Sequence, residues 1–327
     1  MDKKLKWGII GLGNIAHTFA EDLLLFDGAE LYGVASRSKE KAYAFKEKYG
    51  ATKSFSSYND LAKCEDIDVV YIATPHSHHF EHTMLCLTNN KSVLCEKAFA
   101  INSKQVELMM AEAKSRNLFL MEAFWTRFIP TTTKVLELLS SNILGDIKTI
   151  KSGFGFVAAT RNRNRLTNNK LGGGTLLDIG IYPVFMSLLL KGLPNSITTK
   201  ATLENNIDTE LNSIFNYNQS KAFVESSFLK DIPFEVLIEG ENGHLKIDTP
   251  FSAEKKLTLS LKGKPDESFY FDFIGKGYYY EIEEVTKCIN NGQTESELLP
   301  LSFSLKLMNI LDSMRKEIGL VYDADKD

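Results

Sequence analysis

The 327-residue sequence predicts an α/β protein, in which a doubly wound parallel sheet is followed by a second, sheet-rich domain. In the first 120 residues, short apolar strands alternate with segments of helical periodicity, an order typical of a parallel sheet covered by helices. After Glu122, strand-like segments follow one another without helices between them, which favours an antiparallel or mixed sheet. We therefore expect two domains, residues 1–122 and residues 123–327.

The elements of the first domain follow from its hydrophobic periodicity. Strands are predicted at Leu5–Ile10, Glu30–Ala35, Val69–Ala73, Ser92–Cys95 and Leu118–Met121. Helices are predicted at Ile15–Phe26, Lys39–Tyr49, His78–Asn89 and Ser103–Arg116. Ser38 and Ser103 are placed to cap two of these helices, because a serine oxygen there accepts a hydrogen bond from the first turn.

The second domain is predicted to begin with a helix at Thr131–Leu139 and a long strand at Asp146–Val157, before a glycine-rich loop at Gly172–Gly174. Further strands are expected at Ile197–Leu203, Leu211–Tyr217, Ala222–Phe228, Phe234–Glu239, His244–Ile247 and Leu257–Leu261. Two helices, Tyr279–Asn290 and Leu301–Ile318, are expected to close the chain.

A glycine-rich turn joins the first predicted strand to the first predicted helix. Gly11 allows a tight turn, Gly13 lets the backbone approach a pyrophosphate, and Ala16 is the small position where helix meets strand. Asn14 and Ile15 stand at the helix N-terminus, which faces the phosphates. Because the motif sits in the strand–turn–helix context that it requires, it predicts dinucleotide binding in a Rossmann-type domain.

The end of the second strand indicates which dinucleotide is bound. An NAD-preferring fold usually carries an acidic residue there to accept the ribose 2′-hydroxyl, whereas this chain has Ser36, Arg37 and Ser38. Arg37 can clamp a 2′-phosphate while the serines donate hydrogen bonds; the alternative is that Arg37 is a surface cation beside a helix start. NADP is therefore the predicted cofactor, with NAD as the alternative.

Composition excludes several classes of partner. The chain is 43% hydrophobic and 24% charged, and its formal net charge of −4 gives no general attraction to nucleic acid or anionic membranes. It has neither an 18-residue apolar run nor a signal-like N-terminus. The basic run 161–165 is either a solvated loop or a loop near an anionic cofactor or a subunit contact.

Cysteines and histidines give no metal signature. The four scattered cysteines, Cys64, Cys86, Cys95 and Cys288, have no metal-ligand spacing and suit a reducing cytoplasm. A histidine cluster around His76–His82 lacks a Cys or acidic partner that would complete a recognisable site, so no metal is expected. We expect a cytoplasmic protein with no nucleic-acid or membrane partner.

Polar residues follow two predicted strands at the edge where open α/β sheets bind ligands. Thr74, Pro75 and His79 follow one strand, and Glu96 and Lys97 end the next. Neighbouring strand residues point to opposite faces of the sheet. One of Glu96 and Lys97 can therefore contact the nicotinamide ribose while the other contacts the substrate. The alternative for Glu96 and Lys97 is a charged strand end without a functional role. His79 either packs near the cofactor ribose or is a hydrogen-bonded structural histidine at a helix start.

Three ordered blocks together resemble the glucose–fructose oxidoreductase/inositol dehydrogenase (Gfo/Idh/MocA) superfamily. They are Gly11-x-Gly13-x-x-Ala16, Thr74-Pro75-x-x-x-His79 and Glu96-Lys97. Within the superfamily the chain is most similar to dimeric dihydrodiol dehydrogenases and NADP-dependent D-xylose dehydrogenases. That likeness rests on the segments 93–97, 119–128 and 172–182, and it extends weakly through 279–281 and 299–302.

The resemblance implies a Rossmann domain that binds NADP, residues 1–122, and a substrate-binding and dimerisation domain, residues 123–327. The second would be an α+β domain with a large open-faced, mainly antiparallel sheet. The usual Glu-Lys-Pro of the family is here Glu96-Lys97-Ala98, which loses a backbone restraint but no reactive group. Many relatives carry histidine at the position of Tyr182, whereas the dihydrodiol and xylose branch resembles this chain in having tyrosine there. The tyrosine puts inositol-type chemistry in doubt.

Acid–base chemistry is assigned to Tyr182 and Lys97. Oxidation of an alcohol removes a hydride from carbon and a proton from oxygen, so a base must stand at the hydroxyl. A phenol and an ammonium both titrate near pH 10 in water, too high for efficient work at neutral pH. A positive nicotinamide and Lys97 favour the phenolate of Tyr182, whereas burial and the same cofactor charge favour a neutral Lys97. The sequence leaves open which of the two carries the proton.

Aromatic and charged residues complete the predicted site. The resemblance places Trp125 and Arg127 beside the nicotinamide and substrate, although Trp125 also suits a core at the domain junction. Arg127 needs an anionic or carbonyl partner in its apolar setting. Trp125, together with Phe154 or Phe156, is expected to stack on a ring face of the substrate.

Asp178 lies four residues before Tyr182, so that a helix would place both on one face. Pro183 must then stand in the first turn or kink the helix. Asp178 is either a substrate-binding or a structural residue near the cleft.

The sequence thus predicts an NADP-dependent oxidoreductase acting on an aldose such as D-xylose or glucose at C1, or on a cyclic trans-diol. The alternatives are a sugar-ketone reductase of the anhydrofructose type and a non-catalytic NADP-binding regulator, which intact Lys97 and Tyr182 disfavour. A homodimer, or a dimer of dimers, is expected because an uncovered sheet face exposes more apolar area than a monomer tolerates. Alternating Phe234, Val236 and Ile238 fit a buried face, covered either by a partner or by the chain's own helices.

Overall fold

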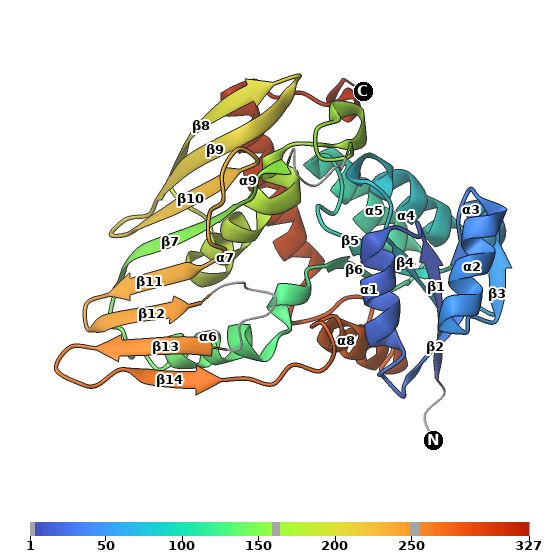
Figure 1. Cartoon of the computed structure of the whole chain (residues 1–327), viewed down its shortest axis with the longest axis horizontal. Helices are drawn as coiled ribbons and strands as arrows, with labels where there is room; N and C mark the ends of the chain where they lie inside the picture. Colours follow the sequence, from blue (N-terminus) through green and yellow to red (C-terminus); the bar gives the residue numbers. More distant parts are fainter. Residues whose placement is uncertain (1–3, 159–163, 249–255, 327) are drawn as a thin grey trace. The chain divides into compact units, whose positions relative to one another are not determined.

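The computed structural model describes residues 4–158, 164–248 and 256–326. These residues form two compact units (Figure 1). Unit 1 comprises the described residues of Met1–Phe128 and Ile274–Leu305, and unit 2 those of Ile129–Phe273 and Lys306–Asp327.

Unit 1 contains a six-stranded parallel sheet in the order β3-β2-β1-β4-β5-β6. Its strands are β1 (Leu5–Ile10), β2 (Ala29–Ala35), β3 (Lys53–Phe55), β4 (Val69–Ile72), β5 (Ser92–Glu96) and β6 (Leu120–Ala123). Its helices are α1 (Asn14–Leu23), α2 (Lys39–Tyr49), α3 (Tyr58–Ala62), α4 (His79–Thr88), α5 (Ser103–Ser115) and α8 (Tyr279–Asn290), with short 3₁₀ turns at His76–His78 and Trp125–Arg127. The chain order reverses between β1 and β4, and this switch point is where doubly wound sheets bind ligands.

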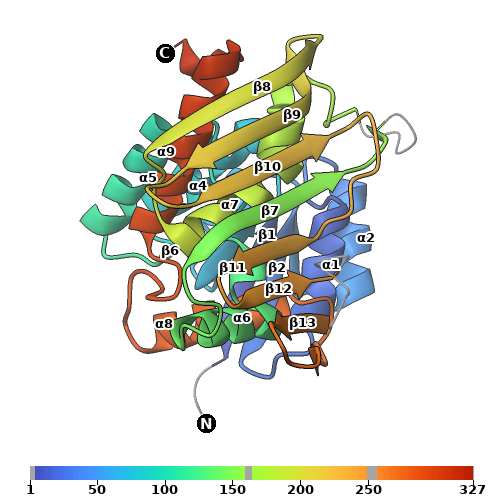
Figure 2. The same cartoon turned by 90° about the vertical axis from the view of Figure 1, so that its left-hand side faces the viewer.

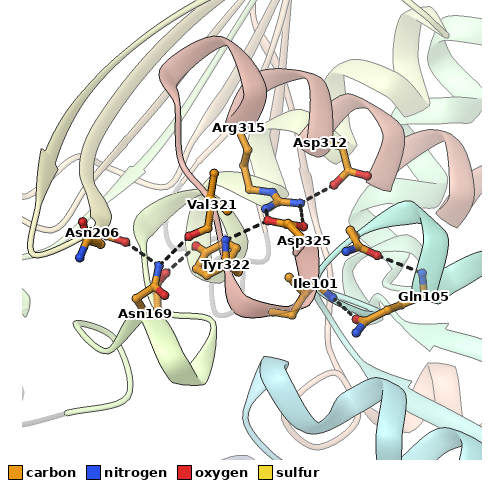
Figure 3. Close-up of polar contacts among 11 residues, drawn as sticks. Ile101, Gln105, Asn169, Asn206, Asp312, Arg315, Val321, Tyr322 and Asp325 are labelled. Atoms are coloured by element: carbon orange, nitrogen blue, oxygen red, sulfur yellow. Dashed lines mark hydrogen bonds and ion pairs between the residues drawn. The ribbon is translucent and has the colours of Figure 1, made fainter. Parts of the chain in front are cut away.

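The N-caps predicted at Ser38 and Ser103 can be compared with the starts of α2 and α5 in the structure. The Ser38 side chain accepts a hydrogen bond from the Lys41 N–H, as predicted. The prediction for Ser103 was wrong: Asn102 is the N-cap of α5, because its side chain accepts from the Gln105 N–H at 3.0 Å. The Gln105 side chain in turn accepts from the Ile101 N–H, so that the two amides fasten the helix start reciprocally (Figure 3).

Residues 274–305, which the expected boundary at residue 122 would assign to the second domain, pack in unit 1. The buried Asp22 carboxylate on α1 explains how they are held. It accepts hydrogen bonds from the backbone N–H groups of Lys276, Tyr278 and Tyr279, at 2.8–3.2 Å. Asp22 thereby caps the start of α8 from another part of the chain, which sequence order alone does not reveal.

Unit 2 contains an eight-stranded sheet in the order β14-β13-β12-β11-β7-β10-β9-β8 (Figure 2). Its strands are β7 (Ile147–Gly155), β8 (Ser196–Glu204), β9 (Ile207–Asn216), β10 (Lys221–Ser227), β11 (Val236–Gly240), β12 (Gly243–Ile247), β13 (Lys256–Leu261) and β14 (Glu267–Tyr270). Neighbouring strands are antiparallel except β7 and β10, so that the predicted mainly antiparallel sheet is confirmed. Helices α6 (Pro130–Ser140) and α7 (Ile181–Lys191) also belong to unit 2, and the division between the units falls within α9 (Leu301–Ile318).

Helix α7 packs against β7 and β10, on one face of the sheet. A π-helical turn, Leu176–Gly180, leads directly into α7. Pro183 is the third residue of α7 and so lies in its first turn, which is the first of the two placements expected for it.

The C-terminal residues of unit 2 fasten the loop that precedes this π-helical turn (Figure 3). The Tyr322 hydroxyl donates to the Gly173 carbonyl at 2.6 Å. The Asn169 side chain donates to the carbonyls of Val321 and Asn206, at 3.2 and 2.7 Å. These bonds tie the loop that leads to the π-helical turn to the C-terminal residues and to the turn between β8 and β9.

Arg315 anchors the same C-terminal residues. Its guanidinium is almost fully buried and pairs with Asp312 at 2.7 Å and with Asp325 at 2.5 Å (Figure 3). Charge-assisted bonds to two carboxylates compensate the burial of the cation.

One helical stretch, Asn169–Lys191, is long and apolar enough to span a membrane by length and composition alone. Within its most apolar window, 83% is buried inside the protein, as in the core helix of a globular domain. Its burial against the unit 2 sheet accounts for its apolar composition.

Candidate active site

The turn after β1 has the geometry that a dinucleotide requires. Gly11 has φ +90°, and a Cβ there would lie 2.7 Å from Thr74 Cγ2 and 2.8 Å from the Ala73 carbonyl. Gly13 is the N-cap of α1, with no side-chain cap, and open space surrounds the position of its missing Cβ. The turn therefore approaches the end of β4 closely while leaving the first N–H groups of α1 accessible to phosphate, which fits the predicted cofactor.

Ser36 and Arg37 stand at the end of β2, next to this turn. Ser36 is buried, and its hydroxyl accepts from the Ser38 N–H at 3.2 Å. Arg37 is exposed, and its guanidinium lies against the hydroxyl of Tyr58; burial raises the pKa of Tyr58 while Arg37 opposes that shift. Tyr58 in turn contacts the ring of His82, with centroids 4.7 Å apart.

Thr74 and Pro75 follow β4 and connect this polar region to α4. The Thr74 hydroxyl lies 3.0 Å from His82 Nδ1, and burial lowers the pKa of His82 to about 4. His79, at the start of α4, is completely buried with its ring nitrogens 2.7 Å from the Ala98 carbonyl and 2.8 Å from the Thr74 carbonyl. Arg37, Thr74 and His79 therefore lie at one edge of the sheet, connected by a chain of contacts that runs through Tyr58 and His82.

Glu96 and Lys97 end β5 at the same edge. Glu96 is buried and accepts a short hydrogen bond from the Tyr71 hydroxyl on β4. Lys97 is half-buried, and the Lys97–Ala98 peptide bond is cis. The Phe99 N–H donates to Glu122 Oε1 at 3.1 Å, so that the segment around Lys97 is fixed on both sides.

Trp125 and Arg127 follow β6 in a 3₁₀ turn of unit 1. The Trp125 ring is 5% exposed and stacks on Tyr278, with centroids 5.5 Å apart. Arg127 Nε donates to the Leu298 carbonyl at 2.8 Å, which is the carbonyl partner that its apolar setting requires. Burial lowers the pKa of Arg127, and Glu284 opposes that shift.

Buried carboxyl groups surround β5 and β6. Burial raises the pKa of Glu122 to about 7; the Ser304 side chain and the hydrogen bond from the Phe99 N–H oppose this rise, and the nearby Glu96 adds to it. Burial also raises the pKa of Glu281 on α8 well above its ordinary value, and neither of its carboxyl oxygens has a hydrogen-bond partner. Perturbed carboxyls of this kind are concentrated at functional sites.

Unit 2 contributes an aromatic group around Tyr182, near the start of α7. Phe154 on β7 and Phe234 stack with centroids 4.5 Å apart and planes 11° from parallel. The Tyr182 ring lies 5.3 Å from Phe234 and 6.3 Å from Phe154. Phe156 packs instead in a buried cluster with Phe228, so that Phe154 is the partly exposed ring of the two expected.

Asp178 lies in the π-helical turn and is 7% exposed. Its carboxylate pairs with Arg165 at 3.0 Å. Arg165 comes from the basic run 161–165, of which residues 161–163 lie outside the described residues.

Several residues of these two regions were not predicted from the sequence. Tyr278 was not singled out, and Phe234 was predicted only as part of a buried sheet face, because each contacts the region from a distant segment. Glu122 had a recognisable signal, since it is a lone carboxylate in the apolar run Leu120–Ala123. Among the described residues, no group of His, Cys, Asp and Glu side chains could hold a metal ion.

The comparison with known families identifies the family to which the chain belongs. Residues 5–124 match the description "Oxidoreductase family, NAD-binding Rossmann fold", and residues 132–246 match "GFO/IDH/MocA C-terminal domain". The chain belongs to the Gfo/Idh/MocA family. The predicted resemblance is therefore confirmed.

Relatives in the Gfo/Idh/MocA family match nearly the whole chain. Trans-1,2-dihydrobenzene-1,2-diol dehydrogenase of Xenopus laevis is 35% identical over 97% of this chain and 99% of the relative. The enzyme of the same name from Homo sapiens is 34% identical over 98% and 99%. This Gfo/Idh/MocA protein is thus an NAD(P)-dependent oxidoreductase that acts on CH–OH groups.

Solved structures share the fold. A 3-ketoreductase from Actinomadura kijaniata in complex with NADP has a TM-score of 0.88 at 22% identity, covering 97% of this chain and 98% of that one. An aldose-aldose oxidoreductase from Caulobacter crescentus also has a TM-score of 0.88, at 23% identity and with 96% and 97% coverage. The two-part α/β architecture is therefore that of Gfo/Idh/MocA oxidoreductases.

Glu122 gives a testable pH dependence of stability. Its folded pKa of about 7 exceeds the ordinary 4.5, so the folded protein binds more protons at this site than the unfolded chain between these values. Stability from this carboxyl is therefore present at low pH and lost as the pH rises through 7. We expect Glu122→Gln to gain roughly 3 kcal/mol in free energy of unfolding relative to wild type between pH 4.5 and 8.

Urea denaturation of wild type and variant at a series of pH values measures this difference. Glu107→Gln, which changes an exposed carboxylate on α5, is the matched control and should track wild type at every pH. Parallel curves for wild type and Glu122→Gln would show that Glu122 titrates normally.

Proposed function

We propose that this protein is an NADP-dependent dehydrogenase of sugars, such as D-xylose, or of cyclic trans-diols, in which Tyr182 and Lys97 handle the proton. The observation that carries the proposal is the setting of Tyr182, a phenol beside the stacked rings of Phe154 and Phe234. Near full-length similarity to dihydrodiol dehydrogenases supports the same substrate class.

The aromatic rings suit a substrate with an apolar ring face. Phe154, partly exposed and stacked on the buried Phe234, offers a π surface against which the C–H face of a pyranose or the plane of a dihydrodiol packs. The Asp178–Arg165 pair, near the same helix start, supplies a carboxylate acceptor and guanidinium donors for hydroxyl groups. Trp125 in unit 1 is proposed as a further stacking surface, held by Tyr278.

Bound nicotinamide supplies the hydride acceptor or donor. Tyr182 binds the reacting hydroxyl and takes its proton, and Lys97 stabilises the phenolate and hydrogen-bonds to it. The pyrophosphate is proposed to bind at the glycine turn, Gly11 and Gly13, and at the first residues of α1. Thr74, Pro75 and Glu96 are proposed to contact the nicotinamide half of the cofactor. Arg127 contributes positive charge to this proposed region.

The reverse reaction on a sugar ketone is the alternative function. The same residues serve it, because a phenol that accepts a proton in oxidation donates it in reduction. A non-catalytic regulator is set aside, since the family and the named relatives are oxidoreductases.

A homodimer formed through the sheet of unit 2 is also proposed. Phe223 on β10 and Ile214 on β9 are a directly opposed cross-strand pair, and they are 37% and 38% exposed. Large apolar side chains exposed side by side favour burial by a second copy. Four free cysteines support a cytoplasmic location.

A substrate panel tests the function. We expect NADP reduction, followed by the near-ultraviolet absorbance of NADPH, with D-xylose, D-glucose or trans-dihydrodiols. Amino and carboxylic acids of similar size serve as negative controls. Turnover of sugar ketones with NADPH, without oxidation of any aldose or diol, would assign the alternative function.

Substitution of the acid–base pair tests its role. Tyr182→Phe and Lys97→Met are each expected to lower kcat by about 10²–10⁴-fold, because each removes a group that handles the proton. Steady-state kinetics with the best substrate measure the loss. Tyr43→Phe and Lys104→Met change exposed residues and should retain wild-type kcat. Only a few-fold loss in both test variants would remove the pair from the chemistry.

Substitution of Arg37 tests cofactor preference. A charge-assisted bond to a 2′-phosphate contributes about 1.5–3 kcal/mol, so Arg37→Ala should raise KM for NADP by roughly 10–100-fold. KM for NAD should change little, because NAD lacks that phosphate. The neighbouring exposed cation provides the control variant Lys39→Ala. Equal changes for both cofactors would contradict the role of Arg37.

A further inference from the structure

The surroundings of His79 determine its charge. Nδ1 lies 2.7 Å from the Ala98 carbonyl oxygen, and Nε2 lies 2.8 Å from the Thr74 carbonyl oxygen. The side chain is 0% exposed. One ring therefore connects the loop that follows β4 to the loop that follows β5.

Carbonyl oxygens accept hydrogen bonds and never donate them. A neutral imidazole donates from one nitrogen and presents a lone pair at the other, so it would leave one of the two carbonyls facing a lone pair at close range. A buried carbonyl without a donor costs free energy that the fold must offset elsewhere. The imidazolium donates from both nitrogens and satisfies both oxygens.

We infer that His79 is a buried imidazolium in the folded protein and that it acts as a positioning residue for Lys97. The part that concerns Lys97 rests on the proposed function. The charge of His79 does not, because it follows from the two carbonyl contacts alone.

His82, one turn further along α4, provides an internal contrast. Its Nδ1 lies 3.0 Å from the Thr74 hydroxyl, which can donate as well as accept, so that a neutral ring is satisfied there. Burial lowers the pKa of His82 to about 4, in agreement with a neutral ring. Two histidines three residues apart are thus expected in opposite charge states.

Lys97 belongs to a short segment, Glu96–Phe99, that three buried side chains hold. Tyr71 donates to the Glu96 carboxylate, His79 donates to the Ala98 carbonyl, and Glu122 accepts from the Phe99 N–H. Of these contacts, the one made by His79 is at the residue directly after Lys97.

Titratable groups lie in the 3₁₀ turn before α4 and at the ends of the strands next to the two loops that His79 connects. His76, in the 3₁₀ turn before α4, has its ring edge-on at 5.6 Å. Glu96 and Lys97 come from the end of β5, and Glu122 comes from β6. The two carbonyl oxygens, at 2.7 and 2.8 Å from the ring nitrogens, present partial negative charge to the buried cation.

Nitrogen NMR of uniformly ¹⁵N-histidine-labelled, cofactor-free full-length protein tests the charge. At about pH 8.5, two units above the ordinary histidine pKa of ~6.5, we expect one ring with both nitrogens protonated. Its signals should be absent in His79→Gln, while the His82 ring is neutral. If that variant does not fold, through-bond correlation of the ring to the wild-type backbone makes the assignment. A spectrum in which every ring is neutral, or a charged ring that persists in folded His79→Gln, would overturn the inference.

Kinetics test the positioning role. Removal of one anchor should misplace Lys97, so His79→Gln is expected to lower kcat roughly 10–100-fold, with KM for NADP changed less than about threefold. His78→Gln, in the preceding and partly exposed position, should match wild type. Normal kcat in folded His79→Gln overturns the positioning role. Normal kcat in Lys97→Met instead rejects the proposed function and leaves the NMR result intact.

Discussion

The close approach of Gly11 to the end of β4 is the constraint on which the dinucleotide region of unit 1 depends. A side chain at residue 11 would collide with the Ala73 backbone at 2.8 Å, and φ +90° is a conformation that few residues other than glycine adopt. Because β1 and β4 are neighbours at the switch point, this contact sets where α1 begins relative to Thr74. The uncapped start of α1 and the polar residues after β4 are therefore positioned relative to each other by one backbone contact.

Buried carboxyl groups tie several segments of unit 1 together. Asp22 receives backbone N–H groups from the start of α8, and Glu122 receives the Phe99 N–H. Glu281, by contrast, has two buried oxygens without hydrogen-bond partners, and burial keeps its pKa high. A neutral carboxyl is far less costly to bury than a carboxylate, which explains how so many acidic groups are accommodated near β5 and β6.

Most of the fold was predictable because its signals are local. The strand at Leu5–Ile10 and the helices at Lys39–Tyr49, Tyr279–Asn290 and Leu301–Ile318 lie at the predicted residues, since their periodicity is long or their boundaries carry Gly or Ser signals. Short or polar elements were missed. The three-residue β3, the five-residue α3 and the polar β14 are too short or too polar to show a period.

The candidate site was predictable to the extent that its residues sit in motifs. Gly11, Thr74 and Glu96 were found because each follows a strand in a recognisable pattern. Tyr278 and Phe234 were not, since a ring that packs against Trp125 or Tyr182 from a distant segment leaves no trace in spacing. The wrong cap at Ser103 has a similar origin, because Asn102 and Ser103 are both good caps and only the backbone geometry separates them.

The electrostatics around Tyr182 narrow the proposed substrate class further. Asp178 is compensated by Arg165, so the polar side of this region offers a balanced ion pair instead of a net charge. Phe154, partly exposed and backed by the buried Phe234, adds an apolar ring surface that is stabilised by contact with C–H groups and offers no hydrogen bond or counter-charge to an ionised group. A carboxylated or phosphorylated substrate would lose its hydration here without gaining an unpaired opposite charge from these residues. A neutral sugar or dihydrodiol would instead exchange water for the Asp178 carboxylate as an acceptor, the Arg165 N–H groups as donors, and the face of an aromatic ring. The local physics of unit 2 thus favours an uncharged polyhydroxylated ring over a charged metabolite.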